Sequence, residues 1–136
     1  MMIGGGVNHI DNNIFYENNY GIRMEGGRNT VNNSIFFGTG ANTWTYIKQI
    51  TGSYSGDYNL FFGASSGWTW NNGSDIATMG TWRIASSQDA HSLNSDALFT
   101  NPGLADFTLK SGSPAIGAGV YIAGVSTANP PNIGAK

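Results

Sequence analysis

Short apolar stretches separated by asparagine- and glycine-rich segments make up the first half of the chain. Residues 14–16 (Ile-Phe-Tyr) and 35–37 (Ile-Phe-Phe) have the length of a β-strand, and apolar runs with a helical period are absent there. Asn and Gly tolerate left-handed backbone better than other residues, so the polar segments between these stretches are predicted to be turns. The pattern therefore predicts short β-strands joined by tight corners.

The chain also repeats itself. The segment Asn8–Tyr16 recurs 21 residues later as Asn29–Phe37, and a weaker copy, Asp57–Gly63, follows the matching residues 32–38 by 25 residues. Intervals of this size suit one coil of a solenoid, in which each coil hydrogen-bonds to its neighbours at about 4.8 Å. The register predicts stacked inward side chains: Ile10 on Val31, Ile14 on Ile35 on Leu60, Ile22 on Ile47, and a corner ladder of Asn12 on Asn33.

Two other architectures share part of this pattern. A leucine-rich repeat has a similar period but needs Leu at fixed spacing, and Leu is scarce here. An antiparallel sandwich built from short strands stays open as the alternative.

The repeat Asn8–Gly38 resembles that of right-handed parallel β-helix proteins, the pectate-lyase-like superfamily. Residues 57–62, 88–93, 97–102, 106–119 and 132–135 resemble the segments that close many such proteins. The resemblance implies an all-β fold, a short right-handed parallel β-helix (solenoid) with a C-terminal capping segment. We expect a single domain, 1–136, with coils over 7–63, a Trp-rich insertion over 64–87, and the final coil and cap over 88–136.

Composition narrows the partners. Charged residues are 10% of the chain and the net charge is −2, so the basic surface that binds nucleic acid is not expected. No apolar run approaches the ~20 residues that cross a bilayer, so no membrane partner is expected. The chain has no Cys, which excludes disulfides. Residues 1–6 lack the features of a signal peptide, whereas the resemblance implies a secreted or cell-surface protein.

Catalytic residues are not evident. The resemblance implies Arg or Lys as a base, often beside Ca²⁺ held by carboxylates, or a set of Asp residues in the hydrolases. We interpret Arg23 and Glu25 as a surface ion pair and His91 as a structural turn histidine. The sequence supports neither a Ca²⁺ site nor another cofactor. It also leaves open whether the chain is a lyase-like or glycoside-hydrolase-like enzyme, and its catalytic residues are unknown.

The insertion is the candidate binding site. Its aromatic and polar residues suit a sugar, whose C–H faces stack on rings while its hydroxyls take hydrogen bonds. The candidate substrate-binding residues are Trp44, Trp68, Trp70, Asn72, Asp75 and Trp82. The competing interpretation is that these tryptophans pack the long loop onto the coil.

These observations lead to two hypotheses for function. The first is a polysaccharide- or oligosaccharide-recognising domain related to polysaccharide lyases and hydrolases, without a complete catalytic site in this chain. The second is a non-catalytic structural or assembly module. Because nothing before Val7 resembles a covering helix, we also expect a homo-oligomer formed through the uncapped N-terminal coil.

Overall fold

The computed structural model describes residues 1–39 and 45–134. Its strands are β1 (Met2–Ile3), β2 (Val7–Asp11), β3 (Ile14–Tyr16), β4 (Tyr20–Asn32), β5 (Ile35–Phe37), β6 (Thr45–Asp57), β7 (Leu60–Phe62), β8 (Gly67–Thr69), β9 (Asp75–Ile76), β10 (Leu93–Asn94), β11 (Phe99–Asn101) and β12 (Asp106–Leu109). The helices are α1 (Met79–Ser86) and the short 3-10 helix η1 (Pro102–Leu104). The protein is thus mainly β.

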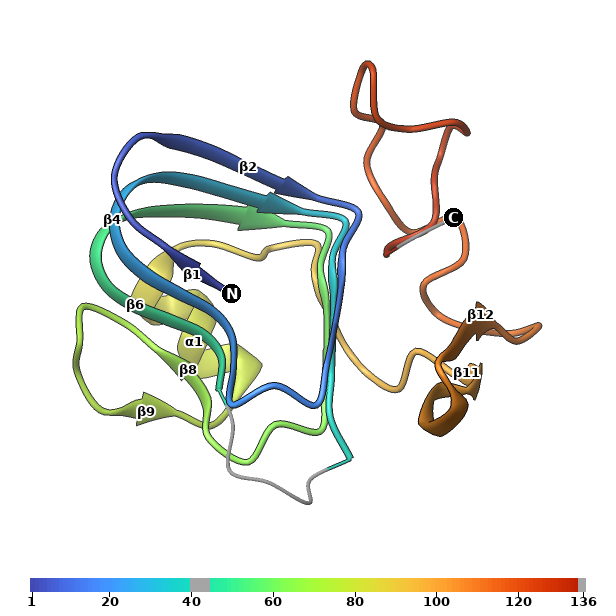
Figure 1. The fold of residues 1–136 in the computed structure, drawn as a ribbon, viewed down its shortest axis with the longest axis horizontal. Coiled ribbons are helices and arrows are strands. Elements are labelled where there is room, and N and C mark those ends of the chain that lie inside the picture. Colours follow the sequence, from blue (N-terminus) through green and yellow to red (C-terminus); the bar gives the residue numbers. More distant parts are fainter. Residues whose placement is uncertain (40–44, 135–136) are drawn as a thin grey trace.

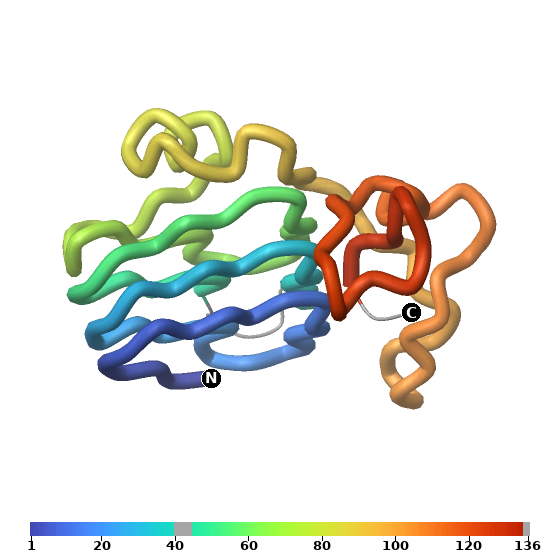
Figure 2. Tube along the Cα trace, turned by 90° about the horizontal axis from the view of Figure 1, so that it is seen from above, coloured from blue at the N-terminus to red at the C-terminus, as the bar shows by residue number. Residues whose placement is uncertain are grey.

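The strands form three sheets in the described part of the chain (Figure 1). A six-stranded sheet has the order β1-β4-β6-β8-β9, with β2 also paired to β4. A four-stranded sheet has the order β10-β7-β5-β3, and β11 pairs with β12. Figure 2 shows the successive passes of the first half of the chain lying one above another.

The parallel registers in this stack confirm the pairs that the repeat predicts. Ile10 pairs with Val31, and Ile22 with Ile47. Residues 14–16 pair with 35–37, and these pair with 60–62, so that Ile35 lies between Ile14 and Leu60. The interval between the copies therefore equals one pass of the chain through both sheets.

The backbone conformation at the corners also follows the repeat, but the hydrogen bonds of the corner side chains do not. Asn12, Asn33 and Tyr58 occupy the same corner in successive passes, and all three have a left-handed backbone with φ between 51° and 58°. The expected amide ladder from Asn12 to Asn33 is wrong. The Asn33 side chain instead donates to the Val120 carbonyl at 2.7 Å and accepts from its N–H at 2.8 Å, because the C-terminal segment lies against this corner.

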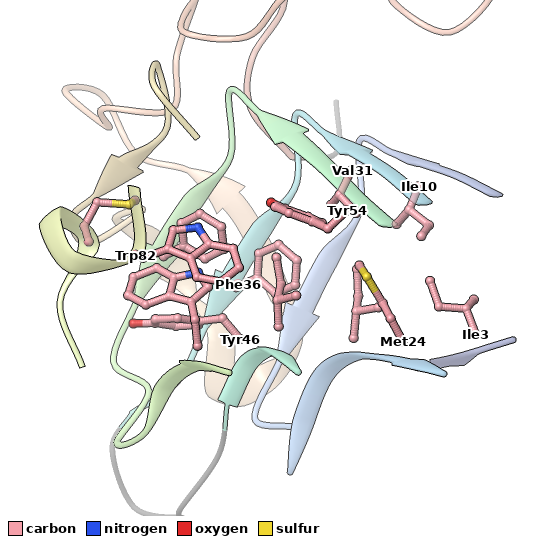
Figure 3. Packing of buried hydrophobic residues seen from close by; sticks show 13 residues of the cluster. Ile3, Ile10, Met24, Val31, Phe36, Tyr46, Tyr54 and Trp82 are labelled. Carbon is pink, nitrogen blue, oxygen red and sulfur yellow. The ribbon is translucent and has the colours of Figure 1, made fainter. Parts of the chain in front are cut away.

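Side chains of the four-stranded sheet enter two different cores. Phe36 stacks between Phe15 and Phe61 with centroid distances of 4.7 and 5.0 Å, in the core enclosed by the stacked passes (Figure 3). Its neighbours Ile35 and Phe37 point to the opposite face, as alternation along a strand requires. The column of Ile14, Ile35 and Leu60 is therefore packed beneath the C-terminal segment and not in the core that holds Ile10 and Val31.

The identification as a right-handed parallel β-helix protein of the pectate-lyase-like superfamily is wrong. The described strands combine parallel and antiparallel pairs and do not form a closed solenoid. Two features break the parallel pattern. A turn at Asn71 and Asn72, both with positive φ, sends β9 back antiparallel to β8, and the β11–β12 hairpin lies beside the stack (Figure 1).

The last pass is covered by α1. Met79 and Trp82 on this helix pack into the enclosed core. The residues after 96 belong to the segment 88–136 that was expected as the final coil and cap. They lie along the outer face of the four-stranded sheet, where Phe99 and Ile133 join the second core (Figure 2). No helix in residues 1–39 or 45–134 is long and apolar enough to cross a membrane.

Candidate functional site

Two of the predicted sugar-binding tryptophans lie in the core. Trp68 and Trp82 are 1% and 0% exposed and stack on each other at 5.8 Å (Figure 3). Tyr46 packs on Trp68 and Tyr54 on Trp82. With their ring faces covered by protein, neither tryptophan can stack on a sugar in this structure, and the packing interpretation describes both.

The other predicted residues are spread over the insertion. Trp70 is half-buried with its ring at right angles to Trp82, and Asn72 is exposed at the β8–β9 turn. Asp75 is exposed in β9, where its Oδ1 accepts a hydrogen bond of 2.8 Å from Thr69. Trp44 lies outside the described residues.

Asp75 also lines a surface pocket, which we call the Tyr20 groove. It has a volume of about 340 Å³, and its walls come from β4, β6 and the β8–β9 hairpin. Its lining residues are Asn19, Tyr20, Thr45, Lys48, Ser66 and Asp75. A second hollow of about 370 Å³ shares Asn19 and Tyr20 with it and extends to Met1, Met2, Asn18 and Arg23.

Two cations lie beside the Tyr20 ring. Lys48 Nζ is 5.4 Å and Arg23 Cζ is 5.9 Å from its centroid. The Arg23 guanidinium is neutralised by Glu25 at 2.6 Å, as the predicted surface ion pair requires. Lys48 forms no ion pair with a described residue. The groove therefore offers one cation whose charge is not already balanced by a contacting carboxylate.

The sequence interpretation missed Asn19, Tyr20 and Lys48. The repeat carried the necessary signal, because the parallel register that follows from it places Tyr20 beside Thr45 and Arg23 beside Lys48. Nothing in the composition of these strands, however, distinguishes a lysine that lines a groove from an ordinary exposed one.

His91 lies in a turn and is held in place by its neighbours. Its Nδ1 and backbone N–H both lie 2.7 Å from the Asp57 carboxylate, and its ring stacks on Tyr58 at 4.9 Å. None of its described contacts is with a serine hydroxyl. The geometry is that of a turn held by a side-chain pair.

A buried carboxylate that the sequence did not indicate joins α1 to the stack. Asp89, 1% exposed, accepts hydrogen bonds from Tyr54, Asn59, Trp82 and Ser92 at 2.6–3.1 Å. Burial and the Asp89 charge raise the pKa of Tyr54 well above its ordinary value. Each of these four donors finds its acceptor on Asp89, so the network is a structural one.

No cluster of three or more His, Asp or Glu side chains suited to a metal ion occurs in residues 1–39 and 45–134. The fold and the groove together define a mainly β domain with a shallow, charged surface site. No protein family model, curated protein or solved structure is significantly similar to the chain.

Proposed function

We propose that the protein binds an anionic oligosaccharide, such as one containing uronates, in the Tyr20 groove. The observation that carries the proposal is Lys48, a half-buried cation without a carboxylate partner in the described residues, next to an aromatic ring. A ligand carboxylate would supply the missing partner through a charge-assisted hydrogen bond.

The rest of the groove suits the uncharged part of a sugar. The Tyr20 ring provides an apolar face with a polar hydroxyl, and Asn19 an amide that both donates and accepts. Asp75 uses one carboxylate oxygen for Thr69, which leaves the other to accept from a sugar hydroxyl. Because the two hollows share residues, an oligosaccharide would contact more of the surface than a single sugar.

Isothermal titration with an acidic oligosaccharide and a neutral one of the same length tests this proposal. We expect only the acidic oligosaccharide to bind. Its affinity should fall as salt is added, since surface charges are screened over about 8 Å at physiological ionic strength. Replacing Lys48 with Met should lower the affinity about tenfold, the value of one charge-assisted contact. Lys110→Met, at an exposed lysine directly after β12, is the matched control.

The result against the proposal would be equal binding of the two oligosaccharides, or an equal loss in the Lys48→Met and Lys110→Met variants. Binding that instead quenches tryptophan fluorescence and is lost on replacing Trp70 would return the site to the insertion. In that case the prediction of a tryptophan binding site would be supported, and the proposal that the ligand binds in the Tyr20 groove would be wrong.

An assembly role is the second candidate. The outer edges of β1, β2 and β3 have no paired strand among the described residues, and such edges readily pair with another chain. We propose that the 136-residue chain forms a homo-oligomer through this edge. Sedimentation velocity at micromolar concentration should show a species larger than the monomer, and a monomer at every concentration would contradict it.

A further inference from the structure

The turn between β8 and β9 carries two asparagines with similar surroundings and different neighbours in sequence. Asn71 and Asn72 are both exposed, and both have a left-handed backbone, with φ of 50° and 52°. Neither side-chain amide forms a hydrogen bond with a described residue. Gly73 follows Asn72, and this is the only Asn-Gly pair in the 136-residue chain. The two asparagines therefore differ mainly in the residue that comes next.

Asparagine is a thermolabile residue because its side chain can react with the adjacent backbone. The main-chain nitrogen of the following residue attacks the side-chain Cγ, which closes a five-membered succinimide ring and releases the side-chain nitrogen as ammonia. Water then opens the ring at either of its carbonyls and gives aspartate or isoaspartate. The reaction consumes water and releases ammonia, so it needs no oxidant, reductant or cofactor.

Gly73 favours this ring closure at Asn72. A Cβ on the residue that supplies the nitrogen would crowd the closing ring, and glycine has none. The Gly73 N–H donates to the Trp70 carbonyl at 3.0 Å and must leave it before the attack. This contact lies at the exposed end of a hairpin whose second strand, β9, has two residues. Local opening of such a turn requires little free energy.

Asn71 lacks this advantage. The nitrogen that would attack its Cγ belongs to Asn72, whose side chain crowds the ring and whose N–H donates to the Gln49 carbonyl at 2.9 Å. Both attacking nitrogens are thus hydrogen-bonded at similar distances, and the side chain on the attacking residue is what differs. We infer that Asn72 is a site of spontaneous deamidation, at which the β8–β9 turn gains a carboxylate as the protein ages. This inference does not depend on the Tyr20 groove.

Peptide mapping by mass spectrometry during incubation of the folded chain at physiological temperature and pH tests the inference. We expect aspartate and isoaspartate to appear together at position 72, because both arise from one ring. Asn72 should react at least about tenfold faster than Asn71, a ratio that needs a difference of only about 1.4 kcal/mol in the barrier. The rate at Asn72 should rise with pH, since the attacking nitrogen must lose its proton.

Two variants change the residue that follows an asparagine. Gly73→Ala adds a Cβ to the attacking residue, at 3.0 Å from the Trp70 carbonyl oxygen, and should slow the reaction at Asn72 by about tenfold. Asn72→Gly suits the positive φ at this position and gives Asn71 a following glycine, so it should transfer the reaction to Asn71. An unchanged midpoint of urea unfolding shows that each variant remains folded.

Reaction at Asn72 no faster than at Asn71, or aspartate without isoaspartate, would overturn the inference. An unreactive Asn71 in the folded Asn72→Gly variant would also overturn it, because the following glycine would then not be the cause. Deamidation confined to the chain unfolded in urea would mean that the folded turn protects Asn72, which is likewise the opposite of what we infer.

Discussion

Replacing Asp89 with Asn tests whether the buried carboxylate holds α1 on the stack. The change is isosteric, and Asn tolerates the left-handed backbone of this position, where φ is 58°. Packing and backbone strain should therefore stay as they are. What changes is that one of the two acceptor oxygens becomes an NH₂ group.

The contacts determine the cost. One Asp89 oxygen accepts from Trp82 Nε1 and the Tyr54 hydroxyl, and the other from Asn59 Nδ2 and the Ser92 hydroxyl. The hydroxyls can turn to accept from the new NH₂ group, but the indole and amide N–H groups only donate. Whichever way the substituted amide is oriented, one of these donors faces another donor.

A buried donor without an acceptor costs about 1–3 kcal/mol, and hydrogen bonds to a charged group are worth more than those to a neutral amide. We therefore expect Asp89→Asn to lower the free energy of unfolding by about 2–4 kcal/mol, a large part of the roughly 5–15 kcal/mol typical of a domain. The assay is urea unfolding followed by tryptophan fluorescence, with the slope m checked for constancy.

Asp106→Asn is the matched control, since the Asp106 carboxylate lies at the surface and accepts from Thr108. Its effect should be much smaller, because surface substitutions away from buried polar networks change stability little. If Asp89→Asn were as stable as the unmodified chain, or no less stable than the control, the proposed role of the carboxylate would be refuted.

Three further outcomes follow from the core and the corners. Ile35→Ala should cost about 2–5 kcal/mol in urea unfolding because Ile35 is fully buried, against less than about 0.5 kcal/mol for the exposed Ile84→Ala. Gly52→Ala should lower the free energy of unfolding by more than about 1 kcal/mol, since φ is 84° and the new Cβ would lie 2.5 Å from the Gly26 backbone. The control is Gly80→Ala in α1, where the new Cβ meets no atom within 4 Å, and it should not destabilise the protein. Equal effects of the two substitutions would contradict this prediction. The raised pKa of Tyr54 keeps its hydroxyl protonated above about pH 10, where the same tyrosine of the unfolded chain loses its proton. The free energy of unfolding should therefore fall with rising pH in that range, by up to about 1.4 kcal/mol per pH unit. Tyr54→Phe should flatten this slope.

The repeat was sufficient to predict the strand register. Its copies keep the same residue types at the same intervals, so pairing Ile10 with Val31 and Ile35 with Leu60 satisfies every copy at once. It could not predict which core receives Ile35. Either face of a three-residue strand that is apolar throughout can be buried. Ile35 lies in the second core because the C-terminal segment covers that face of the strand.

The tryptophans show the same limit in the candidate site. An aromatic residue beside Asn and Asp has the composition of a sugar platform and equally that of a core residue next to a turn. Tyr46 and Phe61 in the last passes leave apolar faces that must be covered, and Trp68 packs against both. The Trp68 ring is therefore positioned by contacts with other passes of the stack, and these contacts cannot be read from the sequence around Trp68.

The same alternation makes the groove suitable for mutational tests. Lys48 stands between Ile47 and Gln49, which are 0% and 2% exposed and point into the stack, so its own side chain must point outward. Gln49 is fixed there by its hydrogen bonds to Gly52 and Asn71. Replacing Lys48 removes a charge from the surface without opening a cavity or breaking a described hydrogen bond. A change in ligand affinity on Lys48→Met can consequently be attributed to the groove itself, which is not true of any substitution at Trp68 or Trp82.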